Sequence, residues 1–517
     1  MGNIRSNVAD TNSMDCGIYC QNNRNDAVIN NREVEKMGIL SGLKPENVYY
    51  YFEEICKIPH GSGNTKMISD YIVSIAKKKN LKYVQDENNN CIIYKDGSKG
   101  YEDSATVILQ GHMDMVCEKE DGCDIDFENE GLRLKLEDGI ISADGTTLGG
   151  DDGIAVAYML AILDSDEYVH PPLECVFTVD EEIGMLGAAS IDMSAIKGRT
   201  MINLDSEEEG YLLVSCAGGE TSTVHLPYTV IDEEADTFRI TVTGLEGGHS
   251  GAEIDKGRAN ANMLLGRVLN NIRKSDNSLR IVSVNGGLKD NAIPRSSQAV
   301  LVTSNPDMLE KVSKNLEKIL KNEYSITDKS VRILIEKGER DYPMDEKSTA
   351  RVIAALVNLP NGIFNMSFDM PGLVQTSLNL GILKTEREKN EVTCSYSVRS
   401  SINTQKEELV QKLESLAEVL GGYVTNMGEY PAWEYNKNSR LRDIMTDEYR
   451  KLFGKDMIVM SMHAGVECGL FGGGLAGLDA VSIGPDMKDI HTPRETMQAE
   501  SVKRTWEYLL HVLERLK

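Results

Sequence analysis

The chain contains four short, nearly continuous apolar runs bounded by turn or polar residues, at 106–109, 173–178, 200–204 and 478–483. Runs of this length suit strands that are buried on both faces of a mostly parallel sheet. The pattern also predicts a helix over 153–163, between two of the runs, which completes the strand–helix–strand unit of such a sheet. We therefore predict an α/β fold built around a mostly parallel sheet.

A second type of pattern interrupts the first. With 517 residues the chain is long enough for at least two domains. Between 218 and 431 it carries two similar series of predicted strands and helices, typical of a two-lobed α+β domain of ferredoxin-like type. The α/β pattern returns from 432. We predict one domain formed by 37–217 and 432–517, with 218–431 inserted into it.

Residues 1–36 differ from the rest, since they are rich in Asn and Asp and show little apolar periodicity. We expect a disordered N-terminal extension. Its opening, MGNIRS, fits the N-myristoylation pattern only weakly. An upstream extension of a chain that starts at Met37 explains the same segment equally well.

Composition excludes several classes of function. Lys and Arg number 55 against 81 Asp and Glu, which gives a net charge of −26. A surface this acidic argues against nucleic acid or an anionic membrane as the main partner. The ten cysteines include no C-x-x-C pair, which favours the reducing cytoplasm over a disulfide-bonded protein. These features suit a soluble enzyme with a small substrate.

The most informative feature is the set of side chains just after the apolar runs. In an open α/β sheet, ligands bind beyond the carboxyl ends of the strands. Histidine or acidic side chains come after all four runs, namely His112 and Asp114, Glu181 and Glu182, Asp205, and His491.

Asp151 stands at the start of the predicted helix over 153–163, where a carboxylate also serves as an ordinary N-cap. Taken together, two imidazoles and three carboxylates suit two divalent cations that share one bridging carboxylate. Such mixed ligands accept Zn, Mn or Co, and we expect Zn. A site of this kind hydrolyses amides or esters.

Six segments carry a family resemblance. They resemble the M20 metallopeptidases, most closely the aminoacyl-histidine dipeptidase (Xaa-His dipeptidase, peptidase D) branch. The segments are GHMDMV (111–116), ADGTTLGGDDG (143–153), DEEIG (180–184), NLDSEEEG (203–210), HAGVECGLF (463–471) and IHTP (490–493).

The resemblance implies a ligand set. Asp151 would bridge two metal ions, with His112 and Asp205 completing one site and Glu182 and His491 the other.

It also implies two supporting roles. Asp114 would orient its neighbouring histidine, and Glu181 would be the general base. The sequence departs from the family at Asp152, where Asn is typical; the extra carboxylate could change the metal preference without removing a ligand.

For the inserted domain, the resemblance implies a lid that closes over the substrate. His249 would stabilise the oxyanion of the tetrahedral intermediate. Arg399 would clamp the substrate α-carboxylate, which guanidinium binds with two hydrogen bonds. Weaker candidates for substrate binding are Asn291, Arg295, Asn379 and His463.

We therefore predict a cytoplasmic di-metal dipeptidase whose leading substrates are Xaa-His (carnosine-like) dipeptides. Two alternatives share the metal site: a broad di- or tripeptidase and an N-acyl-amino-acid deacylase. A third, of another class, is a metal-binding protein without catalysis. A homodimer is left open.

Overall fold

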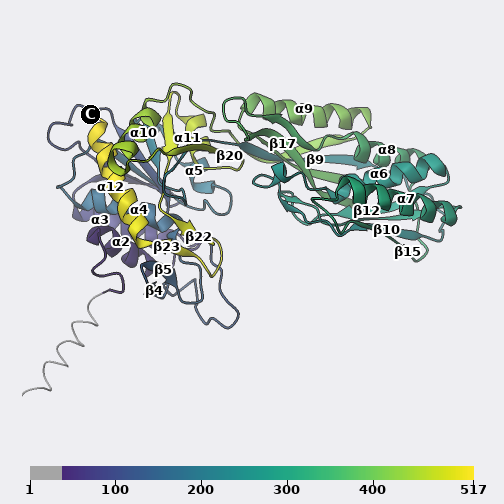
Figure 1. Ribbon diagram of the computed structural model, residues 1–517, viewed down its shortest axis with the longest axis horizontal. Coiled ribbons are helices and arrows are strands. Elements are labelled where there is room, and N and C mark those ends of the chain that lie inside the picture. Colours follow the sequence, from purple (N-terminus) through teal and green to yellow (C-terminus); the bar gives the residue numbers. More distant parts are fainter. Residues whose placement is uncertain (1–37) are drawn as a thin grey trace, which may run out of the picture.

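The computed structural model describes residues 38–517, so the prediction for 1–36 lies outside the described residues. Figure 1 shows an elongated molecule with two bodies joined near one edge. We keep the division proposed from the sequence and call residues 38–217 and 432–517 the α/β domain and residues 218–431 the inserted domain. Within residues 38–517, none of the helices combines the length and apolar composition that crossing a bilayer requires.

The α/β domain is built on an eight-stranded sheet. The strands, in spatial order, are β1 (Lys82–Gln85), β2 (Cys91–Lys95), β6 (Leu173–Thr178), β3 (Val107–His112), β7 (Thr200–Asn203), β21 (Asp479–Ser482), β8 (Tyr211–Cys216) and β20 (Ile458–Met462). The four central strands, β6 to β21, run parallel. The sheet is mixed overall, because β1–β2, β2–β6 and β21–β8 are antiparallel pairs while β8 and β20 are parallel.

The sheet separates two hydrophobic cores, because successive side chains along a strand point to opposite faces. Ile93 and Leu109 enter the larger core, and Ile92 and Ile108 enter the smaller one. The larger core lies under α2 (Glu46–Cys56), α3 (Lys66–Lys78), α4 (Gly150–Asp164), α10 (Arg440–Phe453) and α12 (Ala499–Arg515). The smaller one lies under α5 (Leu186–Ser190), the 3-10 turn Met193–Ala195 and α11 (Cys468–Gly474).

The two ends of the described chain meet in the larger core. The hydroxyl of Tyr49 in α2 donates to the carbonyl of Ala499 at the start of α12, at 2.7 Å. Figure 1 shows the yellow C-terminal helix beside the purple N-terminal ones. The α/β domain is therefore completed only by the last segment of the chain.

A small antiparallel sheet lies beside the larger core, in the order β22 (Met487–Lys488), β23 (Thr496–Gln498), β5 (Ile140–Ala143) and β4 (Leu134–Glu137). The turn between β22 and β23 contains His491, whose φ of 60° is in the left-handed region. This hairpin holds His491 against the start of α4.

The inserted domain is a nine-stranded antiparallel sheet covered by helices on one face (Figure 1). Its main path is β15 (Arg332–Lys337), β10 (Phe238–Thr243), β14 (Ser297–Val302), β12 (Arg280–Gly286), β17 (Val374–Glu386), β18 (Glu391–Ser400), β9 (Gly218–Pro227) and β19 (Tyr423–Tyr430), with β16 (Gly362–Met366) beside β17. The helices are α6 (Ala261–Ser275), α7 (Pro306–Glu323), α8 (Glu346–Asn358) and α9 (Asn403–Val419). The 3-10 turn Ile254–Lys256 and the short pair β11 (Gly248–His249) and β13 (Ala292–Ile293) complete it.

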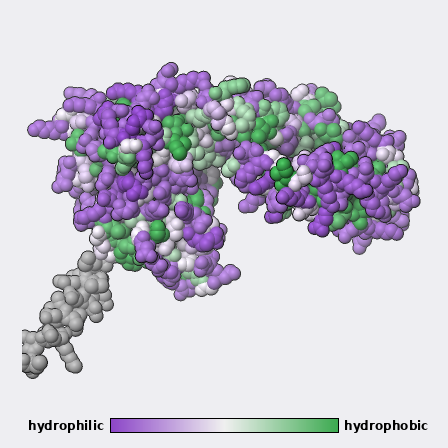
Figure 2. Space-filling view, in the orientation of Figure 1, coloured by the Kyte–Doolittle hydropathy of each residue, from purple (hydrophilic) through white to green (hydrophobic). Residues whose placement is uncertain are grey.

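The nine-stranded sheet has two halves. They meet where β12 pairs with β17 through one register position, Gly286 opposite Leu383. On the face shown in Figure 2, the surface of both domains is mostly hydrophilic, in keeping with the net charge of −26.

Candidate active site

Three neighbouring strands deliver acidic and histidine side chains to one edge of the large sheet. His112 ends β3, Glu181 and Glu182 follow β6, and Asp205 follows β7. Because β6, β3 and β7 are parallel neighbours, their carboxyl ends lie at the same edge. Asp151 reaches this edge from the start of α4.

The carboxylate of Asp151 is shared between two groups of side chains. Its Oδ1 lies 3.2 Å from Nε2 of His112, and that nitrogen lies 3.5 Å from Oδ1 of Asp205. Its Oδ2 lies 3.0 Å from Nε2 of His491, which in turn lies 3.0 Å from Oε1 of Glu182. The structure thus brings together all five predicted ligands, arranged as two sets around one carboxylate.

The charges of the five residues are strongly coupled. Hydrogen bonds to Asp151 and Glu182 raise the pKa of His491 to about 10. Burial alone would lower the pKa of His112, but the surrounding carboxylates raise it well above its usual value. Burial also opposes ionisation of Asp151, yet the two histidines hold its pKa well below the usual range. Both imidazoles therefore carry a positive charge, and they neutralise the surrounding carboxylates as metal cations would.

This donor set fits two divalent cations. Among residues 38–517, no lysine or arginine forms an ion pair with Asp151, Glu182 or Asp205. Burial raises the pKa of Asp205 to about 6, despite the nearby imidazole of His112. Imidazole nitrogens and carboxylate oxygens suit Zn, Mn or Co, and such ions would neutralise this cluster.

Asp114 lies beneath both the metal ligands and the predicted base. Nδ1 of His112 lies 3.0 Å from the backbone carbonyl of Asp114 and 3.5 Å from its Oδ1, which leaves Nε2 of the ring for the metal. The Asp114 carboxylate also accepts from the backbone N–H groups of Glu181 at 3.1 Å and Glu182 at 3.4 Å, and from the hydroxyl of Ser62 at 2.8 Å. Asp114 thereby orients a ligand through its backbone carbonyl and its carboxylate, and its carboxylate also fixes the loop that carries the predicted base.

Burial raises the pKa of Glu181 to about 9, and the carboxylates of Asp205, Glu467 and Glu182 add to this effect. Nearby divalent cations act in the opposite direction, because their positive charge favours the carboxylate. The protonation of Glu181 therefore depends on whether cations are bound by the neighbouring ligand residues.

Asp152, the departure from the family pattern, lies beside the proposed metal ligands. It is fully buried, and its Oδ2 accepts from the backbone N–H of His112 at 3.2 Å. A Cβ at Gly111 would clash with this oxygen, so only glycine fits there. An oxygen of Asp152 also lies within 4.8 Å of ligand atoms of His112 and Asp205.

Glu495 is a supporting residue that we did not predict. Its buried carboxylate accepts from the backbone N–H groups of Leu148 and Gly150 at 2.8 Å, and more weakly from those of Gly149 and Asp151. Consecutive N–H groups in such a turn form a nest that needs an anion. The Leu-Gly-Gly sequence before Asp151 is the only local sign of this requirement, and it does not reveal which acid meets it.

Glu467 lies near the same edge of the sheet, where its carboxylate contacts residues at the ends of the strands. Its Oε2 accepts from the side chains of Gln110 at 2.5 Å and Thr178 at 2.7 Å. Gln110 in turn accepts from Asn203 at 2.7 Å. These three residues lie on β3, β6 and β7, close before the ligand positions. The segment 463–471 carries part of the family resemblance, but its pattern indicates no role for Glu467.

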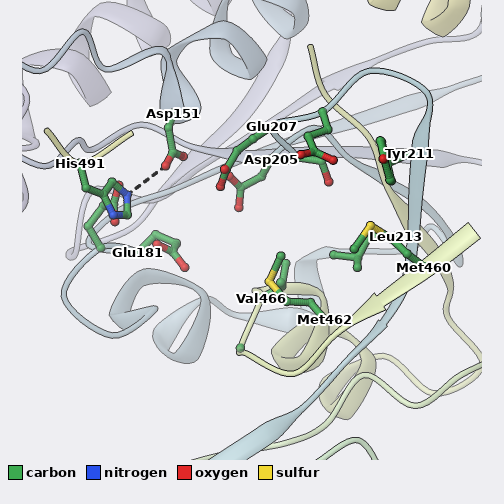
Figure 3. Close-up of a pocket in the computed structure, with 14 residues that line it drawn as sticks. Asp151, Glu181, Asp205, Glu207, Tyr211, Leu213, Met460, Met462, Val466 and His491 are labelled. Carbon is green, nitrogen blue, oxygen red and sulfur yellow. Dashed lines mark hydrogen bonds and ion pairs between the residues drawn. The ribbon is translucent and has the colours of Figure 1, made fainter. Parts of the chain in front are cut away.

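A cavity of about 350 Å³ opens beside the five residues. Figure 3 shows His491, Asp151 and Glu181 on one side and Tyr211, Leu213 and Met460 on the other. Glu207 and Asp205 lie between these groups in the same view. The cavity is therefore polar at the metal ligands and apolar further away.

Three of the predicted substrate-contacting residues, His249, Arg399 and His463, lie near the junction of the two domains. Nε2 of His463 lies 2.7 Å from Oγ of Ser377, and Nη1 of Arg399 donates to the hydroxyl of Tyr430 at 3.2 Å. A Cβ at Gly251 would lie 2.5 Å from the carbonyl oxygen of His463 and 3.0 Å from Cε1 of His249. Neither His249 nor Arg399 is among the described residues that line the 350 Å³ cavity.

His249 and Arg399 keep donor groups available. Nδ1 of His249 accepts from the N–H groups of Gly251 and Ala252, which leaves the N–H on Nε2. Burial lowers the pKa of His249, and Arg399 lowers it further, so the ring is neutral near pH 7. Nε of Arg399 is buried without a hydrogen-bond partner among the described residues.

The other three candidates differ in what they contact. The side-chain amide of Asn379 donates to the carbonyls of Asp290 and Ala292, so it holds the loop before β13. Asn291 and Arg295 are exposed on either side of that strand. Nε of Arg295 donates to the carbonyl of Leu245 at 3.3 Å.

Comparison with known proteins gives consistent results. A model of peptidase family M20/M25/M40 matches residues 108–515. The cytosol non-specific dipeptidase of Escherichia coli (strain K12) is 36% identical over 485 residues, which span 93% of this chain and 99% of that protein. The structure of aminoacylhistidine dipeptidase from Vibrio alginolyticus matches with a TM-score of 0.87 and 35% identity, over 94% of this chain and 99% of that one. The aminopeptidase PepT structure from Bacillus cereus ATCC 10987, at a TM-score of 0.52 and 16% identity over 92% of this chain and 99% of that one, shares the fold. These matches confirm the predicted fold class.

Proposed function

Because the chain belongs to peptidase family M20/M25/M40, as its motifs predicted, we propose that it hydrolyses dipeptides, Xaa-His dipeptides among them. The names of its relatives support this substrate class, since one is called a non-specific dipeptidase and another an aminoacylhistidine dipeptidase. We also propose that it acts in the cytoplasm, as the name of the first relative suggests. The homodimer stays a prediction.

The division of the Asp151 carboxylate between two ligand sets carries the proposal. His112 and Asp205 would hold one divalent ion, and Glu182 and His491 the other. Two such ions polarise a carbonyl and make water acidic enough to ionise near neutral pH. We expect zinc, and the same ligands accept Mn or Co.

Glu181 is the proposed general base. It would take a proton from the attacking water and deliver it to the nitrogen of the leaving amine. Asp114 supports this role, because it holds the backbone N–H of Glu181 at 3.1 Å and so fixes where its carboxylate lies.

The inserted domain would supply two groups to the substrate. The N–H on Nε2 of His249 would donate to the developing oxyanion, and the guanidinium of Arg399 would bind the α-carboxylate. Since neither lines the cavity in this arrangement, we propose that the domains close about the segment 463–467, which contacts both. Closure would also exclude water from the site.

The alternatives differ in what they cleave. A broad di- or tripeptidase would accept a third residue, and a deacylase would accept an acetylated amine. A metal-binding protein without catalysis would lack a base or a ligand, whereas Glu181 and all five predicted ligands are present.

The test is a hydrolysis panel with chelator-stripped protein to which Zn or Mn is restored. The substrates are β-Ala-His, α-dipeptides with and without C-terminal His, a tripeptide and N-acetyl-amino acids. We expect metal-dependent cleavage of dipeptides only. Cleavage confined to acetylated compounds would overturn the substrate class, and no cleavage with two metals bound would favour the non-catalytic alternative.

A further inference from the structure

The cavity beside the metal ligands has an apolar wall on the side away from His491. This wall consists of Tyr211, Leu213, Met460, Met462 and Val466, and we call it the methionine wall. None of these residues belongs to the proposed metal or catalytic set.

The wall follows from the pairing of two strands. β8 and β20 are parallel, with Leu213 opposite Met460 and Tyr211 opposite Ile458. Because side chains alternate along a strand, Met460 and Met462 point to the same face. Ser461, between them, points the other way, and its hydroxyl donates to the carbonyl of Ser215. The edge strand β20 and its neighbour β8 thus present a row of large apolar side chains to the cavity.

Glu207 faces this wall across the cavity (Figure 3). Only its backbone carbonyl has a partner, the N–H of Met487 at 2.9 Å. Within residues 38–517, no side chain or backbone donor pairs with its carboxylate. The carboxylate is partly shielded from water and available to a ligand.

The charges around the cavity select the end of a peptide that enters it. Among residues 38–517, six carboxylates line it and no lysine or arginine does. Even two divalent ions would leave negative charge beyond the five ligands. An ammonium group is attracted to such a site and a carboxylate is repelled. The cationic Arg399 lies instead at the domain junction.

We propose that this part of the cavity binds the amino-terminal residue of the substrate, with its α-ammonium on Glu207 and its side chain on the methionine wall. This subsite rests on the proposed dipeptidase function and specifies its substrate class. It favours long apolar amino-terminal residues such as Leu and Met, because a thioether wall adapts to their shape. The free amine adds to binding, so substrates without it, acetylated ones included, are hydrolysed much more slowly.

The first test removes the charge of Glu207. We compare Glu207→Gln with wild type on Leu-His and on its analogue without the α-amine, 4-methylpentanoyl-His, and measure the metal content of each protein. Loss of a charged hydrogen bond predicts a fall in kcat/KM of about 10- to 100-fold for Leu-His. The same variant should change hydrolysis of the analogue by less than about threefold. The contrast is Glu208→Gln: this carboxylate also lines the cavity but is more exposed, so its loss should lower kcat/KM for Leu-His less than Glu207→Gln does.

The second test shortens the wall. Met460→Ala should reduce the preference for Leu-His over Ala-His by about 10-fold, the effect of losing apolar contacts in a pocket. Met427→Ala, an exposed methionine on β19, is the control and should leave that preference unchanged.

The outcomes distinguish failure of the proposed subsite from failure of the proposed dipeptidase function. If wild type cleaves dipeptides but Glu207→Gln slows both substrates equally, or Glu208→Gln has the larger effect, the ammonium site is wrong. If Met460→Ala keeps the wild-type preference for Leu-His over Ala-His, the methionine wall does not bind the amino-terminal side chain. If wild type cleaves no dipeptide, the proposed function itself fails and the subsite falls with it.

Discussion

Nε2 of His491 lies 3.0 Å from Oδ2 of Asp151, although 340 positions separate the two residues in the chain. The first stands in the hairpin between β22 and β23, the second at the start of α4. The whole inserted domain lies between them in sequence. The contact therefore joins the two separate parts of the α/β domain at the point where metals would bind.

The shared carboxylate predicts unequal effects of ligand substitutions. Asp151→Asn should lose both ions, because each ligand set loses a charged oxygen. Asp205→Asn should lose only the ion beside His112 and keep the one held by Glu182 and His491. Elemental analysis after dialysis gives the metal content per chain. Equal stoichiometry in the two variants would contradict the bridging role.

Glu181 should matter for turnover without being needed for metal binding. Glu181→Gln should retain two ions per chain while kcat falls by about 10²- to 10⁴-fold, the usual contribution of a general base. Its neighbour gives the contrast, since Glu182→Gln should lose metal as well as activity. Substantial activity in Glu181→Gln would show that another group accepts the proton.

Metal binding should release protons. Without metal, the pKa of His491 is raised to about 10 and that of His112 is also raised, so both rings are protonated near pH 7. Each must lose a proton before its Nε2 can bind an ion, so metal affinity should rise with pH up to about pH 10. Calorimetric titration in two buffers of different ionisation enthalpy measures the release. Identical heats in both buffers would show that the rings are already neutral.

Glu495 should control metal affinity without touching a metal. In Glu495→Gln, an amide group would face the N–H groups of residues 148–151 and disturb the position of Asp151. We expect metal affinity to fall by about 10- to 100-fold, as is typical when a residue that orients a ligand is changed. Glu500→Gln, an exposed change nearby, is the control. Competition with a fluorescent chelator measures both affinities.

His463 should make stability sensitive to mild acid. Burial, with Arg399 and His249 nearby, lowers its pKa to about 3, whereas an unfolded histidine has a pKa of about 6.5. Between these values the unfolded state binds more protons, so this contribution to stability is lost as the pH falls below about 6.5. The slope from this residue approaches about 1.4 kcal/mol per pH unit.

Urea unfolding of chelator-treated protein at pH 7 to 5 checks this dependence. The curve for His463→Asn should be flatter than that for wild type, whereas that for His511→Asn, at an exposed position, should match wild type. Parallel curves for His463→Asn and wild type would mean that His463 is protonated in the folded state.

The sequence predicted the central strands well, because β3, β6, β7 and β21 are continuous apolar runs. It did not indicate β8 or β20 as strands. β20 contains only a short apolar run, Ile458 to Met460, and lies at the edge of the sheet, where Ile458, Val459 and Met462 are exposed. The methionine wall was missed for the same reason.

The residues of the candidate site could also be predicted only in part from the sequence. His112 ends β3 and Asp205 follows β7 closely, so local pattern was enough to select them. Glu495 acts on backbone groups some 345 positions away, and nothing in its neighbourhood marks it. The junction cluster of His249, Arg399 and His463 could be named from motifs, but its distance from the metal cavity depends on how the domains pack.

The order of strands has a consequence for how the protein is made. β21 lies between β7 and β8, which are consecutive in the chain, so the sheet has a gap until residues 479–482 have left the ribosome. The inserted domain has emerged completely by then and forms its own sheet without them. Domains generally fold as units during synthesis. We therefore expect the inserted domain to fold first, while β7 and β8 wait for their central partner, so that chains truncated before β21 should be recognised by chaperones or proteases.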